Sequence, residues 1–308
     1  MKVMQLIETA KGLALQPSER PTPTPASEEI LVRVHAAGVT TAELEWQPTL
    51  QQRDGSARQS IPTHEFSGEV ASIGEGVNGF SVGQAIYGMN DWYQEGALAE
   101  FCVAPASSVA AKPKSLTYEQ AASVPIGALT AWQALTTHGH LEPRQRVLIH
   151  GGAGGVGFFA VQFAKSLGAQ VIATTSASSI ALVKDLGADQ VLDYRTSRFD
   201  QELRDIDLVV DTVGGDTLTR SWNVLRPGGR VVTVVSGIPD DAPQHIRDAF
   251  FLVQPDGPRL AEIAALFDSG KLQTFVKAFV PLQSAAQVYD NSLPSLLNSG
   301  KIVISITA

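Results

Sequence analysis

The sequence predicts an α/β protein in which a β-rich region precedes a doubly wound parallel sheet. The first ~120 residues hold short alternating segments separated by glycine and proline, such as Ile30 to Val34, a pattern typical of an irregular, mostly antiparallel β domain. From Arg146 onward, strand-like and helix-like segments alternate, which is typical of parallel βαβ units. A glycine-rich turn joins the first of these strands to the helix after it.

The alternation in the second half can be followed element by element. Strands are expected at 146–150, 170–175, 190–193, 208–211 and 230–235. Helices are expected from the glycine turn through Leu167, and at 179–186 and 216–225. These are followed by an amphipathic stretch at 259–269, a strand near 274–280, a helix around 284–297 and a strand at 301–306. We therefore expect one domain at 1–122, completed by 275–308, and a second at 123–274.

Composition excludes several classes of protein. With 308 residues, 44% hydrophobic, the chain is long enough for two domains with real cores. Its 23 Lys+Arg against 31 Asp+Glu supply no cationic field, so neither nucleic acid nor a membrane surface is an expected partner. Glu8 interrupts any signal-like start, and no apolar window approaches the ~20 residues of a membrane helix. The single cysteine, Cys102, excludes an intramolecular disulfide and is typical of a reducing compartment, so a cytoplasmic protein is expected.

The glycine-rich turn predicts a dinucleotide site. Residues 151–157 read GGAGGVG and contain GxGxxG at Gly152, Gly154 and Gly157. The early glycines permit a tight turn, the middle ones let the backbone approach a pyrophosphate, and the last lets helix and strand pack closely. A purely structural turn is the alternative, which the strand, helix and second strand around the motif disfavour.

The end of the second strand favours NADP(H) over NAD(H). NAD-binding versions of this unit carry an acid there, whereas this chain reads ATTSASS over residues 173–179. Serine hydroxyls can donate to a 2′-phosphate that a carboxylate would repel. The nearest cation in this segment is Lys184, so the charge of the phosphate has to be met from farther along the chain.

Several short stretches carry a resemblance to a known family. Besides the glycine loop they are VHAAGV at 34–39, THEFSGEV at 63–70, LGAD at 186–189, DYR at 193–195, DTVGG at 211–215 and LRPGGR at 225–230. On these residues the sequence resembles the medium-chain dehydrogenase/reductase superfamily, and within it the zinc-independent quinone oxidoreductase branch. The resemblance spans nearly the whole chain. It implies a GroES-like substrate domain, a Rossmann cofactor domain, an active site in the cleft between them and commonly a homodimer.

The same resemblance implies that no metal is bound. Zinc alcohol dehydrogenases of the superfamily carry a Cys, a His and a second Cys or acid at positions where this chain has Thr40, His64 and Ile126. Three protein ligands are the usual minimum for catalytic zinc. His64 is therefore expected to be a hydrogen-bonded structural histidine, and the reaction to be hydride transfer to an acceptor that is already electron-poor.

Site residues follow from the resemblance. In quinone oxidoreductase relatives a loop reads Asn-Pro-x-Asp, and Thr40 and Glu43 stand at its Asn and Asp positions, which makes them catalytic candidates. Tyr93, Glu43 and solvent are all admissible proton donors, and Trp46, Trp92 and Tyr93 would either stack on a planar acceptor or pack in the core. The expected cofactor-binding residues are Thr130, Gly152, Gly154, Gly155, Val156, Gly157, Thr175, Ser176, Ser178, Tyr194, Val213, Gly214, Ser236, Gly237, Phe251 and Val253.

The resulting expectation is a zinc-independent, NADPH-dependent reductase of a small-molecule quinone or α,β-unsaturated carbonyl. An enoyl or alkenal reductase of lipid or secondary metabolism is an alternative within the same class. A non-catalytic NADPH-binding sensor is an alternative from another class, because no obvious acid or base is present. Relatives often hold the cofactor phosphate with Arg-Gly-Lys before the last strand, and Lys301, which lacks that arginine, is a poor substitute.

Overall fold

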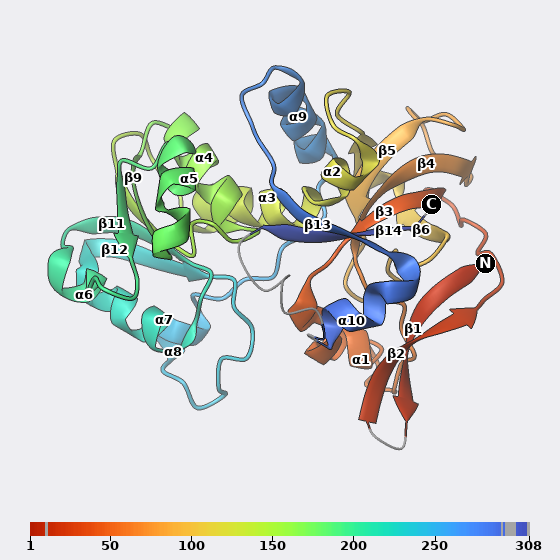
Figure 1. The fold of residues 1–308 in the computed structure, drawn as a ribbon, viewed down its shortest axis with the longest axis horizontal. Coiled ribbons are helices and arrows are strands. Elements are labelled where there is room, and N and C mark those ends of the chain that lie inside the picture. The colour runs from red at the N-terminus through yellow and green to blue at the C-terminus, as the bar shows by residue number, and fades with distance from the viewer. Residues whose placement is uncertain (10–11, 291, 293–299, 307–308) are drawn as a thin grey trace. The chain divides into compact units, whose positions relative to one another are not determined.

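The computed structural model describes residues 1–9, 12–290, 292 and 300–306 (Figure 1). Its contacts divide the chain into two compact units. The first comprises Met1–Ile126 together with the chain from Pro255 onward, and the second comprises Gly127–Gln254. Each unit is described by itself.

The first unit is built on a mostly antiparallel sheet. In the described residues its seven strands are β3 (Glu29–Gly38), β4 (Glu65–Ile73), β5 (Ala85–Met89), β6 (Phe101–Pro105), β7 (Val109–Ala111), β13 (Val276–Pro281) and β14 (Lys301–Ser305). They follow the order β13-β14-β3-β4-β5-β7, β6 also pairs with β3, and only the β13 and β14 pair is parallel. A hairpin of β1 (Lys2–Thr9) and β2 (Gly12–Glu19) completes the β structure. The expected antiparallel β domain is confirmed.

Side-chain alternation explains why this sheet has a core. Ile30, Val32 and Val34 of β3 are fully buried and pack in one cluster with Phe66 of β4 and Ile86 of β5. Alternate residues of a strand face the same side, so these side chains form one apolar face. The sheet therefore presents a rigid base from which the loops after β3 and before β4 project.

Short helices complete the first unit. They are α1 (Gln47–Leu50), α2 (Tyr118–Ala122), α9 (Gly257–Asp268) and α10 (Ala285–Tyr289), with a 3-10 turn at Thr41–Glu45. The phenol of Tyr87 donates to the carbonyl of Leu260 in α9 at 2.6 Å, and Ser115 N donates to Asp268 at 2.9 Å. These bonds attach α9 to the first unit, whereas the sequence expectation placed residues through 274 in the second domain.

The second unit is a doubly wound parallel sheet, as expected. Its strands are β8 (Arg146–His150), β9 (Gln170–Thr175), β10 (Gln190–Asp193), β11 (Ile206–Asp211) and β12 (Leu225–Thr233). They follow the order β10-β9-β8-β11-β12, all parallel. Helices α4 (Gly157–Ser166) and α5 (Ile180–Asp185) cover one face, and α6 (Phe199–Glu202) and α7 (Gly215–Ser221) cover the other (Figure 1). The order reverses between β8 and β11, where such sheets bind ligands at their carboxyl ends.

The remaining helices are α3 (Pro125–Gln133), which continues as a π-helical turn at Ala134–His138, and α8 (Gln244–Arg247). Several expected bounds differ from the structure; the strand expected at 230–235, for example, is β12 at Leu225–Thr233. The helix expected at 216–225 is α7 up to Ser221, continued by a 3-10 helix at Trp222–Val224. β12 begins directly after it at Leu225, and its pairing with β11 shifts register between Ile206 and Leu208. The helix expected at 284–297 is α10 up to Tyr289, and its positions 291 and 293–297 lie outside the described residues.

Candidate functional site

The glycine loop between β8 and α4 forms a cradle of backbone groups. Gly151 has φ of 75°, and Gly154 N donates to its carbonyl at 2.9 Å, which closes the turn. A Cβ on Gly157 would lie 2.2 Å from that carbonyl, so only glycine fits there. The N–H groups of Gly155 and Val156 have no acceptor within the described part of the chain. Free N–H groups at a helix amino terminus fit a pyrophosphate.

A buried carboxylate shapes the neighbouring turn after β11. Asp211, which is fully buried, accepts bonds from Val213 N and Gly214 N and a 2.8 Å bond from the hydroxyl of Thr233 on β12. The turn therefore holds Gly214 at φ of 77° and leaves Val213 53% exposed. Such an exposed apolar side chain at the switch point suits contact with a ribose or nicotinamide ring.

The carboxyl end of β9 presents hydroxyl groups. Ser176 and Ser178 have their hydroxyl oxygens 3.0 Å apart, while Thr175 is buried and its carbonyl accepts a 3.1 Å bond from Tyr194 N. Tyr194 is 58% exposed, and the guanidinium of Arg195 lies 5.4 Å from the centre of its ring. The structure thus supplies a cation, Arg195, on the segment bonded to β9.

The other expected cofactor residues divide by exposure. Ser236 and Gly237 are exposed after β12. Thr130 of α3, Phe251 and Val253 are buried, and the Phe251 ring stacks on His138 with centroids 4.2 Å apart. Gly152 is also buried, and a Cβ there would lie 3.1 Å from Ala173 Cβ, so its role in the loop is close packing.

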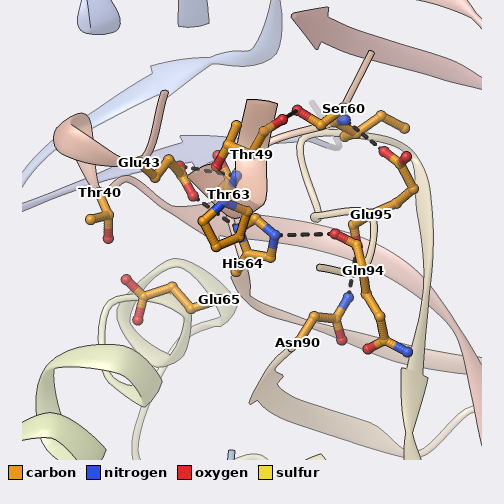
Figure 2. A network of polar contacts seen from close by, with 12 residues as sticks. Thr40, Glu43, Thr49, Ser60, Thr63, His64, Glu65, Asn90, Gln94 and Glu95 are labelled. Atoms are coloured by element: carbon orange, nitrogen blue, oxygen red, sulfur yellow. Dashed lines mark hydrogen bonds and ion pairs between the residues drawn. The ribbon is translucent and has the colours of Figure 1, made fainter. Parts of the chain in front are cut away.

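The catalytic candidate Glu43 lies inside a buried polar network in the first unit (Figure 2). Its Oε1 accepts from Thr63 N at 3.0 Å and from the phenol of Tyr289 at 2.6 Å, and its Oε2 lies 3.0 Å from Nδ1 of His64. The Nε2 of His64 is 3.2 Å from the carbonyl oxygen of Gln94. Both Glu43 and His64 are 0% exposed, an arrangement that favours a positioning role for Glu43. The expected hydrogen bonding of His64 is confirmed.

The charge on Glu43 also acts on Tyr289. Burial, and next the Glu43 carboxylate, raises the pKa of Tyr289 well above its usual range. The phenol therefore remains protonated and continues to donate to Glu43.

A second buried carboxylate, Glu65, lies beside Thr40. Its Oε1 forms a 2.5 Å ion pair with Nζ of Lys301, and its Oε2 accepts from Ile126 N at 2.9 Å. The same Nζ donates to the hydroxyl of Thr40 at 3.2 Å. In Figure 2 the Thr40 hydroxyl and the Glu65 carboxylate turn toward one another. Lys301 is therefore occupied by Glu65 and Thr40.

The aromatic candidates have different environments. Trp92 is 3% exposed and packs against Trp46 and His64, with ring centroids 4.8 Å and 5.1 Å away, so it is a core residue. Tyr93 is half-buried, with the guanidinium of Arg53 4.3 Å from its ring centre. Trp46, like Tyr93, is partly exposed, so these two residues have more surface to offer an acceptor than Trp92 has.

The three positions aligned with zinc ligands do not fit a metal site. Both ring nitrogens of His64 are in hydrogen-bond contact, the Thr40 hydroxyl accepts from an ammonium group, and Ile126 has no donor atom in its side chain. No group of three or more His, Cys, Asp or Glu among the described residues is arranged to hold a metal ion. Likewise, no helix in the described ranges has the length and apolar composition to cross a bilayer.

Four residues that contact the candidate site residues were not predicted from the sequence. Tyr289, Glu65, Lys301 and Asp211 each contact candidate residues, yet none was selected as a site residue. Glu65 and Asp211 lie inside the stretches that carried the resemblance, which is a usable signal. Tyr289 had no local signal, because its partners lie more than 200 residues earlier in the chain.

The fold, the cofactor loop of the second unit and the polar network of the first unit together define a dinucleotide-binding oxidoreductase. Residues 26–114 match the family model of the alcohol dehydrogenase GroES-like domain, and residues 186–304 match that of zinc-binding dehydrogenases. The zebrafish (Danio rerio) protein named NAD(P)H oxidoreductase RTN4IP1, mitochondrial, is 32% identical over 329 residues, with 90% of this chain and 84% of that protein covered. The chain belongs to the medium-chain dehydrogenase/reductase superfamily, in its quinone oxidoreductase-like branch, and is an NAD(P)H-dependent oxidoreductase.

Two further relatives are similar over most of their length. A 2-methylene-furan-3-one reductase of tomato (Solanum lycopersicum) is 29% identical, with 90% of this chain and 71% of that protein covered. The solved structure of the quinone oxidoreductase from Coxiella burnetii aligns with a TM-score of 0.86 at 29% identity, with 100% of this chain and 99% of that chain covered.

Proposed function

We propose that the protein is a zinc-independent, NADPH-dependent reductase whose acceptor is a quinone or an α,β-unsaturated carbonyl compound. This proposal rests on the three positions that align with zinc ligands. Thr40 has a hydroxyl that accepts from Lys301, both ring nitrogens of His64 are in hydrogen-bond contact, and Ile126 has no donor atom in its side chain. Without a Lewis acid, the acceptor has to be electron-poor before it binds. The names of the tomato and Coxiella relatives agree with these two acceptor classes.

The cofactor part of the proposal rests on the second unit. Bound NADPH would supply a hydride. The N–H groups of Gly155 and Val156 would donate to its pyrophosphate, as helix amino termini do. The hydroxyls of Ser176 and Ser178, together with the guanidinium of Arg195, would hold the 2′-phosphate, since Arg and hydroxyl donors recognise phosphate oxygens.

The acceptor part rests on Thr40. Negative charge develops on the acceptor oxygen as hydride arrives at carbon, and a preorganised donor to that oxygen lowers the barrier. The Thr40 side chain is partly exposed and carries such a donor. The enolate or hydroquinone anion then takes a proton from solvent or from Tyr93.

The test is NADPH oxidation followed at fixed cofactor against a panel of quinones, enones and acyl thioesters, with NADH and with a zinc chelator in parallel. We expect turnover of a quinone or enone, a preference for NADPH, and no loss on chelation. Absence of turnover with every acceptor, or loss on chelation, contradicts the proposal. Preferential turnover of acyl thioesters would instead support an enoyl reductase.

One observation favours a non-catalytic NADPH-binding protein as second candidate. Both Glu43 and His64 are fully buried, so neither offers a titratable group to a substrate. Tight NADPH binding without turnover of any acceptor would support this candidate. The expectations of a homodimer and of a cytoplasmic location stay predictions, and the zebrafish relative is itself named as mitochondrial.

A further inference from the structure

The Lys301 ammonium is held between two oxygens of different character. On one side is the carboxylate of Glu65, 0% exposed, at 2.5 Å, and on the other is the hydroxyl of Thr40 at 3.2 Å. The Lys301 side chain is itself only 13% exposed. Its charge is therefore weakly screened by water and acts on both neighbours.

Glu65 fixes the position of this cation. Burial raises the pKa of the Glu65 carboxyl, while the Lys301 ammonium and the bond from Ile126 N oppose that shift. A carboxylate buried without a partner is strongly unfavourable, so Glu65 holds Lys301 in place. Glu65 does not contact Thr40 through any described bond, which makes Lys301 the link between the two.

The hydrogen bonding of Thr40 then leaves its proton available. A hydroxyl has one proton to donate and two lone pairs to accept with. One lone pair of Thr40 accepts from Lys301. Thr40 precedes the 3-10 turn at Thr41–Glu45, but its side chain does not cap that turn, and its O–H has no acceptor among the described residues.

We propose that Lys301, held by Glu65, polarises the Thr40 hydroxyl so that it donates a strengthened hydrogen bond to the acceptor oxygen during reduction. This inference rests on the proposed function and deepens it. Lys301 and Glu65 are positioning residues that act through Thr40, and Thr40 is the residue that touches the acceptor. The ammonium supplies charge near the developing oxyanion without a metal.

Bound NADPH would supply a hydride, with its electron pair, and would be oxidised to NADP⁺. A C–H bond forms at the β-carbon of the enone as its C=C π electrons shift to the bond between the α-carbon and the carbonyl carbon, and the carbonyl π electrons move to oxygen, which gives an enolate. The oxygen anion is stabilised by the hydrogen bond from the Thr40 hydroxyl, and the enolate later takes a proton from solvent or from Tyr93, so Thr40 keeps its proton. For a quinone, the same count gives a hydroquinone.

The experiment compares Thr40→Val, Thr40→Ser and the double variant Lys301→Met/Glu65→Gln with wild type, using the best acceptor of the panel. The double variant removes the cation without leaving a buried carboxylate, and the amide oxygen introduced at position 65 can still accept from Ile126 N. We expect Thr40→Val to lower kcat about 10- to 100-fold with little change in KM, and Thr40→Ser to recover most of the loss. The double variant should show a similar loss of kcat. Adding Thr40→Val to it should lower kcat by less than the product of the two separate fold-losses. Thr41→Val, at an exposed neighbour, is the matched control.

A readout independent of turnover uses 4-nitrophenol, whose absorbance reports its ionisation. In wild type saturated with NADP⁺, the pKa of the bound phenol should lie below its value in water, and it should rise in Thr40→Val and in the double variant. Thermal unfolding checks that the first unit of each variant folds, and NADPH affinity checks the second; if the double variant fails either check, Lys301→Gln/Glu65→Gln takes its place.

The outcomes separate the two proposals. The inference is overturned if Thr40→Val has the same kcat as Thr41→Val, or if the kcat of the double variant is unaffected. It is also overturned if 4-nitrophenol does not bind to wild type. A phenol pKa that depends on Thr40 and Lys301, combined with no turnover of any acceptor, would uphold the inference and contradict the proposed reaction.

Discussion

The phenol of Tyr289 donates a 2.6 Å hydrogen bond to the carboxylate of Glu43, and the two residues are 246 positions apart in the chain. Tyr289 is the last residue of α10, and Glu43 lies in the 3-10 turn after β3. The same phenol is 2.8 Å from the hydroxyl of Thr63. This contact ties α10 to the loop that carries Thr40.

Replacing Tyr289 with Phe removes this tie while keeping the ring. We expect the free energy of unfolding to fall by about 1.5–3 kcal/mol, the range for hydrogen bonds to charged groups, because Glu43 loses a donor inside the core. Urea unfolding measures the change. Tyr93→Phe is the control, because the described side-chain contact of Tyr93 is between its ring and the guanidinium of Arg53, and this substitution keeps the ring. An equal effect of both substitutions would contradict the stabilising role of the bond.

The buried His150 predicts a dependence of stability on pH. Burial, and next Arg220, lowers the pKa of His150 from 6.5 to about 3. Below pH 6.5 the His150 imidazole therefore binds a proton in the unfolded chain but not in the folded protein. The free energy of unfolding should fall by about 1.4 kcal/mol per pH unit as pH decreases from 6.5 toward 3.

The matching measurement is urea unfolding of wild type and His150→Gln at pH 5 to 7, a range above the titration of most carboxylates. The variant should be less stable at pH 7, because it disturbs the contacts of His150 with Thr174 and Ser221, but its slope with pH should be smaller. The exposed His245, replaced by Gln, is the control. Identical slopes in wild type and His150→Gln would refute the assignment.

Two glycines of the cofactor loop should respond differently to alanine. A Cβ on Gly157 would lie 2.2 Å from the Gly151 carbonyl, so Gly157→Ala should lower both thermal stability and NADPH affinity. A Cβ on Gly154 would find its nearest atom at 3.2 Å, so Gly154→Ala should fold and lose cofactor affinity alone, by about tenfold, as expected where the backbone approaches a pyrophosphate. Thermal unfolding and NADPH titration separate the two effects. Wild-type affinity in Gly154→Ala would place the pyrophosphate elsewhere.

Arg195 should determine part of the preference for NADPH. Removing its guanidinium in Arg195→Ala should weaken NADPH binding about tenfold and leave NADH binding unchanged, since only NADPH carries the 2′-phosphate. Ser176→Asp should weaken NADPH binding further by charge repulsion. Lys184→Ala, at an exposed position of α5, is the control. A larger loss in that control than in Arg195→Ala would assign the phosphate to Lys184.

Local patterns were sufficient for the fold and the cofactor loop. The bounds of β8, β9 and β10 agree with the sequence expectation, because buried strands bounded by glycine or charge are visible in a single short window. The glycine spacing is likewise local, and the close approach at Gly157 is its physical reason. The assignment of α9 to the first unit depended on the Tyr87 contact with Leu260, which no window reveals.

By itself, the sequence determined a β-rich domain, a doubly wound sheet and a glycine loop that fits a dinucleotide. Only the tertiary structure decided what the candidate side chains contact. It placed Glu43 in the core with His64 and Tyr289, and it joined Lys301 to Glu65 and Thr40. The reason is that hydrogen bonds and ion pairs form between side chains brought together by folding, whatever their separation along the chain. Lys301, which the sequence offers as a phosphate ligand, is thereby paired with the buried carboxylate of Glu65.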